Sequence, residues 1–349
     1  MAGSRHVAVE RRHRWTAALA LAAQLFATPA ALAQQGGGAA AGEPDGFRPP
    51  ARVEVAPIRS ATLSGQDFLR GDRSAGREAV LAGELRLPPG STPAERVPAV
   101  VLVHGSGGIS GSLDLWAREL NAAGLAAFIL DSFAGRGIVS TVADQNQLHS
   151  LAMMVDAYRA LDWLAAHPRI RPDRIGVLGF SKGAVASVYS AMERFNAGFG
   201  NPDRRFAAHA GLYTPCNVAY REDTRVGSAP IRLYHGIADD YVAIGPCRDY
   251  VARLRQAGAD AALTEYPDAH HGFDSPLSPR LLPVRDAQTT RDCRLSEGVN
   301  GAILNAQGAP FALERDACVA TGAHVGHNPE AAVAVRAAVR DFFRGALLR

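Results

Sequence analysis

The 349 residues could form one large domain or two small ones, and a composition of 47% hydrophobic and 20% charged residues is that of a globular protein with a sizeable core. The formal charge of +3 comes from 37 basic and 34 acidic residues, but the first 33 residues hold four arginines and one glutamate, leaving 33 of each sign. This balance, without a basic stripe interleaved with aromatic residues, argues against nucleic acid as a partner.

Residues 1–33 have the order of features of a secretory signal peptide. Arg11, Arg12 and Arg14 precede an apolar run that ends in Ala31-Leu32-Ala33. The run is near the lower length limit for a membrane-spanning helix, and the small residues favour cleavage. We therefore expect an exported protein, periplasmic or secreted, with no stable membrane anchor after cleavage.

The four cysteines all follow this segment. An even number of cysteines in an exported protein indicates two disulfides, and no C-x-x-C motif is present to suggest a zinc ribbon or a redox site. Of the three pairings, closeness in sequence favours Cys216–Cys247 and Cys293–Cys318.

In chain order, residues 34–48 are rich in Gly and Ala and are typical of a linker, and we assign 34–75 to a linker and N-terminal extension. Strands and helices then alternate. Strands are predicted at 79–87, 97–105, 125–133, 173–180, 206–214, 229–236 and 261–267, and helices at 112–124, 148–168, 182–195, 245–258 and 329–348.

This alternation predicts a mostly parallel sheet covered by helices on both faces, within one domain at 76–349. Residues 273–328, which contain Pro, Gly, Arg and two cysteines, interrupt the alternation of strands and helices. We interpret them as a disulfide-pinned insertion before the last helix.

The sequence G-F-S-K-G at 179–183 lies where a predicted strand gives way to a predicted helix. In this context the pattern G-x-S-x-G forms a sharp turn whose glycines leave no room for side chains, and the strained serine is exposed above the sheet. Ser181 is therefore the candidate nucleophile. The pattern alone is weak evidence, since an ordinary strand–helix turn could also contain it.

A serine nucleophile needs a histidine base and an orienting acid, in the chain order Ser, Asp, His for this type of turn. Asp239 and Asp240 follow the predicted strand 229–236, and His270 and His271 follow the strand 261–267. Carboxyl ends of parallel strands meet at one rim. We expect Asp239, directly off its strand, to be the acid and His271, before Gly272, to be the base.

The stretch V-H-G-S-G-G at 103–108 supplies a glycine-rich loop after another strand. With the backbone amide of Lys182, the amide of Ser106 or Gly107 is a candidate donor to an oxyanion. His104, at the strand end, is expected to hold the loop and not to take part in chemistry.

Together, LVHGSGG, LDSFAGRG, GFSKGA, HGIADDYV and AHHGFD resemble the dienelactone hydrolase family over roughly residues 78–275 and the closing helix. The resemblance implies an α/β-hydrolase fold and a monomeric or dimeric, cofactor-free hydrolase of small-molecule esters or lactones. Many members have a nucleophilic cysteine. Ser181 in its place puts dienelactone itself in doubt as the substrate and suits an oxidising compartment.

Several alternatives stay open. Arg136 in LDSFAGRG could bind a substrate carboxylate or form a salt bridge within its loop. Amides or thioesters could be cleaved by the same triad, and a non-catalytic binding protein could share the fold. The glycine-rich turn at 105–108 with Asp131 resembles an NAD-binding Rossmann unit, but Ser110 stands where the third glycine is required. His324 and His327 have no third ligand nearby, so no metal site is expected.

Overall fold

The structure, a computed structural model, describes residues 52–349. The expected signal peptide and the Gly/Ala-rich stretch 34–48 lie outside the described residues. Within them, no helix is both long and apolar enough to cross a membrane.

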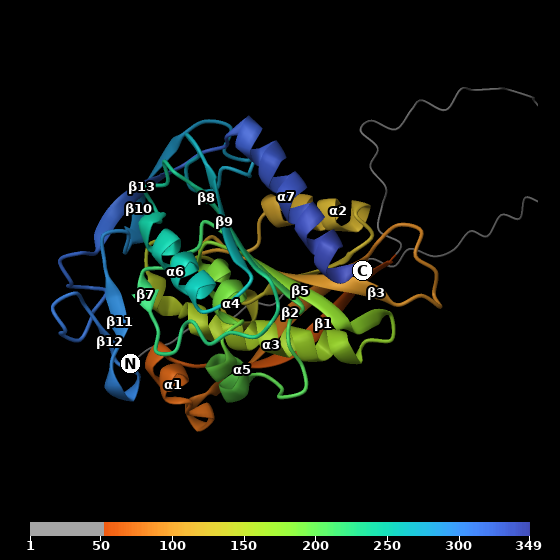
Figure 1. The fold of residues 1–349 in the computed structure, drawn as a ribbon, viewed down its shortest axis with the longest axis horizontal. Coiled ribbons are helices and arrows are strands. Elements are labelled where there is room, and N and C mark those ends of the chain that lie inside the picture. The colour runs from red at the N-terminus through yellow and green to blue at the C-terminus, as the bar shows by residue number, and fades with distance from the viewer. Residues whose placement is uncertain (1–51) are drawn as a thin grey trace, which may run out of the picture. The chain divides into compact units, whose positions relative to one another are not determined.

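An eight-stranded sheet forms the centre of the fold, in the order β1-β2-β4-β3-β5-β6-β8-β9 (Figure 1). β1 and β2 pair antiparallel, as do β2 and β4, and all other neighbours are parallel. The strands are β1 (Arg52–Thr62), β2 (Arg77–Leu87), β3 (Val97–Val103), β4 (Ala126–Asp131), β5 (Ile170–Phe180), β6 (Ala208–Leu212), β8 (Ile231–Gly236) and β9 (Ala261–Tyr266).

The N-terminal boundary of this domain differs from the expected residue 76. β1 pairs with β2 along its whole length, and α1 (Gly65–Arg70) buries Phe68 and Leu69. Only two residues of β1, Ala56 and Ile58, are well buried, because an edge strand needs few apolar residues. Residues 52–75 therefore belong to the fold.

Helices cover both faces of the sheet, and each layer has its own apolar core. α2 (Gly111–Ala122) and α7 (Pro329–Leu347) lie together on one face in Figure 1. α3 (Ser150–Ala166), α4 (Lys182–Tyr189) and α6 (Gly245–Gln256) pack on the other. Short 3-10 turns lie at Arg73–Ala75, Ala134–Arg136, Gln145–Gln147 and Val299–Gly301.

The single helix predicted at 182–195 is wrong. α4 ends at Tyr189, and a separate α5 (Glu193–Phe199) follows. The Ser190 hydroxyl donates back to the carbonyl of Ser187, and Met192 forms a β-bridge with Val226. A serine that bonds its own preceding turn competes with the helix.

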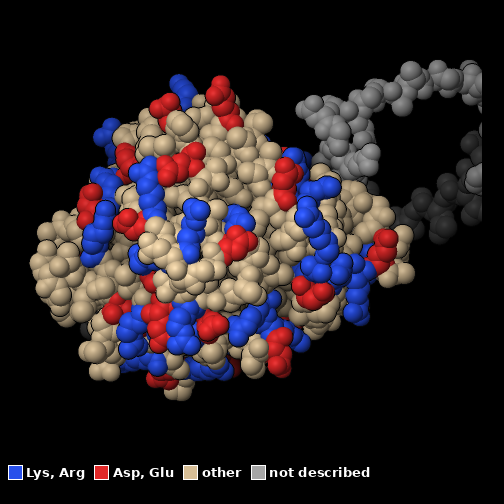
Figure 2. Space-filling model, viewed as in Figure 1, with Lys and Arg blue, Asp and Glu red and all other residues tan. Residues whose placement is uncertain are grey.

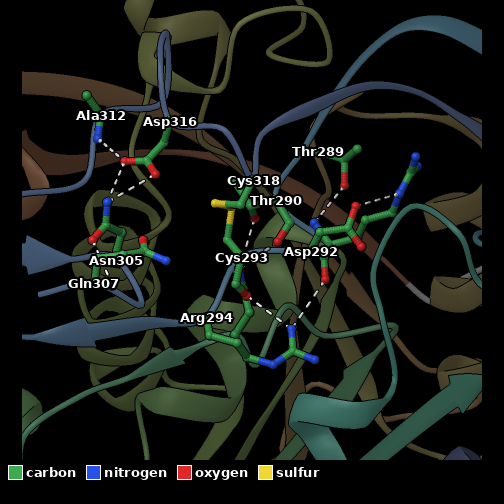
Figure 3. The surroundings of a disulfide bond; sticks show 12 residues. Thr289, Thr290, Asp292, Cys293, Arg294, Asn305, Gln307, Ala312, Asp316 and Cys318 are labelled. Atoms are coloured by element: carbon green, nitrogen blue, oxygen red, sulfur yellow. Dashed lines mark hydrogen bonds and ion pairs between the residues drawn. A yellow bond between two sulfur atoms is a disulfide. The ribbon is translucent and has the colours of Figure 1, made fainter. Parts of the chain in front are cut away.

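The segment 273–328 contributes strands to two small sheets. β10 (Leu282–Thr289) pairs with β13 (Ala320–Val325), and β11 (Leu295–Glu297) joins β12 (Ile303–Leu304) to β7 (Val218–Ala219). Both predicted disulfides are confirmed: Cys216–Cys247 and Cys293–Cys318. The second lies within this segment (Figure 3). We call residues 273–328 the insertion.

Charged side chains of both signs are interspersed over the face of the molecule in Figure 2. No large area of that face carries a single sign. This distribution matches the near-neutral charge that the sequence shows after residue 33.

Candidate active site

Ser181 lies at the sharp turn between β5 and α4, with φ 51° and ψ −118°. A positive φ is strained for a residue with a side chain. A Cβ on Gly179 would lie 2.2 Å from the carbonyl oxygen of Gly183, and one on Gly183 would lie 2.3 Å from the carbonyl oxygens of Val103 and His104. The two glycines are therefore required for the strand, helix and neighbouring chain to approach this closely.

Ser181 is hydrogen-bonded in series to a histidine and an aspartate from two other loops. The Oγ of Ser181 lies 3.0 Å from Nε2 of His271, and Nδ1 of His271 lies 2.9 Å from Oδ2 of Asp239. The histidine and aspartate are buried, with 6% and 7% of their surfaces exposed. Three segments far apart in sequence thus meet at one rim of the sheet.

The neighbouring aspartate and histidine, Asp240 and His270, lie outside this series of hydrogen bonds. Asp240 accepts hydrogen bonds from the backbone and the Nδ1 of His324 in the insertion, at 2.9 and 2.7 Å. His327 bonds through Nδ1 to the carbonyl of Phe273. Nδ1 of His270 is buried and has no hydrogen-bond partner. The geometry therefore separates Asp239 and His271 from their sequence neighbours.

Asp239 is held as a carboxylate by its surroundings. Burial raises its pKa, but the charge of His271 and hydrogen bonds from His235 and His271 outweigh burial, so the pKa falls well below its usual range. Its Oδ1 also accepts from the backbone amides of Tyr241 and Val242 at 2.9 and 2.8 Å. An ionised, fixed carboxylate can orient an imidazole and stabilise its protonated form.

Two tyrosines that the sequence analysis did not identify flank His271. The rings of Tyr213 and Tyr241 lie 4.5 and 4.7 Å from the imidazole, centroid to centroid. The hydroxyl of Tyr213 donates to Asp274, which also accepts from the indole of Trp116. The only sequence signal for either tyrosine is its place just after a strand, at the rim where the candidate residues gather.

The residues predicted to supply the oxyanion donors lie next to Ser181 in the chain or line the same cavity. Lys182 is the first residue of α4, so its amide has no partner within the helix. A Cβ on Gly105 would lie 3.3 Å from the Cβ of Ser181, which shows how closely the 105–108 loop passes. Ser106 is fixed by hydrogen bonds from its hydroxyl to Gln145 and from the amide of Thr141 to its carbonyl. Gly107 follows it, exposed at the loop.

The side chain of Lys182 is buried beside the serine. Its Nζ donates to the carbonyl and Oε1 of Gln145 and to the hydroxyl of Thr141. Burial lowers the pKa of Lys182 to about 7, against a smaller opposite effect of Asp144. The lysine thus ties the turn at Ser181 to the 141–147 loop through neutral partners.

Arg136 does not reach this site. Its guanidinium forms a two-pronged pair with Asp156, at 2.7 and 2.9 Å, and also donates to Thr62 and to backbone carbonyls of Ala61 and Ser132. Only 3% of the Arg136 side chain is exposed. The substrate-binding role is therefore wrong. The arginine does form a salt bridge, but its partner lies on α3 and not within its own loop.

His104 has the loop-holding contacts expected from its place at the end of a strand. Its Nδ1 lies 2.8 Å from the carbonyl of Gly105, and its Nε2 accepts from the amide of Ser132. Asp131, the residue that resembled a ribose-binding acid, accepts from the amides of Phe133 and Ala134. Both side chains are thus used within the turns that follow β3 and β4.

Two cavities open beside Ser181, with volumes of about 550 and 300 Å³. Ser106, Ser181 and Tyr241 line both. The larger cavity also contacts Lys182, the smaller one contacts His271 and α2, and the insertion lines part of each. Volumes of this size are typical of small-molecule sites.

The sequence profile of the dienelactone hydrolase family matches residues 85–296. A dienelactone hydrolase-like promiscuous phosphotriesterase from metagenomic libraries is similar in structure, with a TM-score of 0.53 and 16% identity over 84% of this chain and 98% of its own. The protein called m3DLH has the same TM-score, with 20% identity over 84% of this chain and 99% of its own. These likenesses, with the parallel sheet and its two helix layers, confirm the α/β-hydrolase fold.

Proposed function

Because the chain belongs to the dienelactone hydrolase family and is a hydrolase, we propose that it is an exported serine hydrolase that cleaves carboxylic esters or lactones through Ser181, His271 and Asp239. The observation that carries this proposal is the pair of hydrogen bonds that joins the three side chains at the strained turn. The two cavities beside the serine give a substrate room on either side of it.

In the first half of the reaction, the Oγ of Ser181 attacks the ester carbonyl carbon while Nε2 of His271 takes the hydroxyl proton. Asp239 holds the imidazole in place and stabilises its positive charge. The carbonyl oxygen becomes an oxyanion, which the amides of Lys182 and of Ser106 or Gly107 stabilise. The protonated His271 then gives its proton to the departing alcohol oxygen.

In the second half, water attacks the acyl-enzyme with His271 again as the base, and the acid product leaves with Ser181 restored. Tyr213 and Tyr241 keep the imidazole in the same plane through both halves.

Export is supported by the disulfides Cys216–Cys247 and Cys293–Cys318, since such bonds persist in oxidising compartments. N-terminal sequencing of the protein from the periplasm or medium of an expressing bacterium should begin at Gln34. Retention of the intact N-terminus in the cytoplasm would contradict export without touching the proposed chemistry.

Covalent labelling with a fluorophosphonate tests the chemistry directly. Intact mass should show one adduct, peptide mapping should place it on Ser181, and the His271→Ala variant should remain unlabelled. Ser187→Ala, a buried serine of α4 bonded to the carbonyl of Ala210, is the matched control and should still label. Folded wild-type protein that takes no label and hydrolyses no ester, thioester or amide would overturn the proposal.

A further inference from the structure

Of the two cavities beside Ser181, only one is lined by His271, the proposed base. His271 lines the smaller cavity of about 300 Å³ but not the larger one of about 550 Å³, whereas Lys182 lines only the larger. Ser181 itself lies where the two meet. A substrate bound across the serine must therefore place one of its two parts beside His271 and the other part away from it.

The chemistry decides which part goes where. When Ser181 Oγ bonds to the acyl carbon, the bond from that carbon to the alcohol oxygen breaks, and that oxygen takes the proton held on Nε2 of His271. The alcohol oxygen must then lie within hydrogen-bond reach of His271. The carbonyl oxygen is occupied by the backbone amides, so the remaining substituent, the acyl group, extends into the other cavity.

We propose that the larger cavity is the acyl site and the smaller one the alcohol site, so that the preferred substrates are esters of a bulky acyl group with a smaller alcohol. This inference rests on the proposed function and specifies its substrate class. It also assigns a role to the insertion, because Ile303, Phe311 and Leu313 of the insertion form the apolar wall of the acyl site. Val185 of α4 and Val218 of β7 line the same cavity.

Hydrogen bonds and a disulfide stabilise the part of the insertion that lines the acyl site. Figure 3 shows Asp316 accepting hydrogen bonds from the side chain of Asn305 and the amide of Ala312, on either side of the segment that carries Phe311. The disulfide Cys293–Cys318 anchors the same loop two residues further on. The insertion thus presents a fixed surface that limits how large an acyl group can enter.

The alcohol site has different walls. Leu113, Trp116 and Phe180 line it and are at least 94% buried in the core under α2. Trp116 is fixed by its hydrogen bond to Asp274. Ser275, Ser278, Val284 and Val325 of the insertion complete its lining. Its smaller volume predicts a sharper limit on the size of the alcohol.

A pair of mirrored variants tests the assignment. Leu313→Trp narrows the larger cavity and Ser112→Trp narrows the smaller one, and both replaced side chains are partly exposed, so the core is spared. Each variant is assayed against p-nitrophenyl esters from acetate to octanoate, and against acetates of alcohols from methanol to naphthol. Labelling of Ser181 by a fluorophosphonate checks that each variant keeps its reactive serine.

We expect Leu313→Trp to lower kcat/KM for the octanoate at least tenfold relative to the acetate, about the effect of displacing two buried methylenes. It should leave the alcohol series unchanged. Ser112→Trp should do the reverse. If both variants label but the two effects are exchanged, or neither series responds, the acyl and alcohol assignment is wrong while the proposed chemistry stands.

A covalent adduct gives a second readout. A crystal structure after reaction with a p-nitrophenyl n-octylphosphonate ester should show the octyl chain, which takes the place of the acyl group, against Phe311 and Leu313. A chain beside Trp116 would overturn the assignment. No adduct from this reagent on protein that a fluorophosphonate labels would overturn the assignment alone. No adduct from either reagent, with no hydrolysis, would overturn the proposed function as well.

Discussion

The cluster at Ser181 and the cluster at Arg136 are both built from polar side chains that distant segments bring together after strands of the same sheet. Arg136 and Asp156 are enclosed: Ser60 donates to Asp156, and Thr62 and two backbone carbonyls accept from the arginine. The chain of Asp239, His271 and Ser181 instead ends at a hydroxyl that faces two cavities. A cluster of hydrogen-bonded polar side chains at this rim is thus a candidate for chemistry only where one of its side chains faces a cavity.

The largest effect should come from changing the acid at Asp239. Asp239→Asn keeps the shape of the side chain but removes the charge that orients and stabilises His271, so kcat should fall by about 10⁴-fold. Asp240→Asn, whose carboxylate contacts His324, is the matched control and should change kcat by less than tenfold. Ester hydrolysis by both variants, with melting temperatures to confirm folding, measures the difference. Equal losses would mean that the acid has been assigned to the wrong residue.

The enclosed cluster should respond in stability and not in rate. Arg136→Met leaves the buried carboxylate of Asp156 without its charge partner, which should lower the free energy of unfolding by about 3–5 kcal/mol. Urea unfolding gives this value, and the kcat of the folded fraction should stay within about twofold of wild type, a change of less than about 0.5 kcal/mol in barrier.

Arg118→Met is the control for that experiment. Arg118 pairs with Asp114 one helical turn away, and 52% of its side chain is exposed, so its removal should cost under about 1 kcal/mol. A loss of activity in Arg136→Met that exceeds its loss of folded protein would restore a functional role to the arginine.

The last effect is a pH dependence of stability that comes from Lys182, which is buried beside Ser181 and donates only to neutral partners. Because its pKa is lowered to about 7 in the fold while an unfolded lysine titrates near 10.4, the unfolded chain binds more protons between these values. Stability therefore rises with pH in this window, by up to about 1.4 kcal/mol per pH unit. Below pH 7 both states are protonated and the dependence ends.

Comparison with Lys182→Met isolates this contribution, since the other titrating groups cancel. The difference in unfolding free energy between wild type and variant should shift in favour of wild type as pH is raised from 7 to 9.5. A difference that stays constant with pH would show that the lysine titrates normally.

The sequence predicted most of the parts of the fold that follow from local patterns. Strand and helix alternation and the glycines around Ser181 each depend on residues close together in the chain. The order of Ser, Asp and His could be predicted because each of the three follows a strand of that alternation. The disulfides followed from proximity in the same way. These patterns are strong because buried parallel strands and sharp turns admit few residue types.

The features that the sequence did not predict depend on contacts between distant segments. Arg136 pairs with Asp156 of α3. Tyr213 and Tyr241 are placed at the site by their contacts with His271. β1 pairs with β2 although it has few buried apolar residues. The break at Ser190 depends on a bond to the preceding turn and a bridge to Val226. None of these leaves a periodic signal in the sequence.

One consequence of the buried lysine concerns how the protein can be handled. Lys182 is the single lysine of the sequence, and only 7% of it is exposed. Amine-reactive dyes, crosslinkers and activated resins therefore find no accessible lysine side chain on residues 52–349. Conjugation of this part of the molecule has to use its exposed carboxylates or an introduced cysteine, and a single cysteine placed far from the rim would fix every molecule on a surface with its cavities facing the solution.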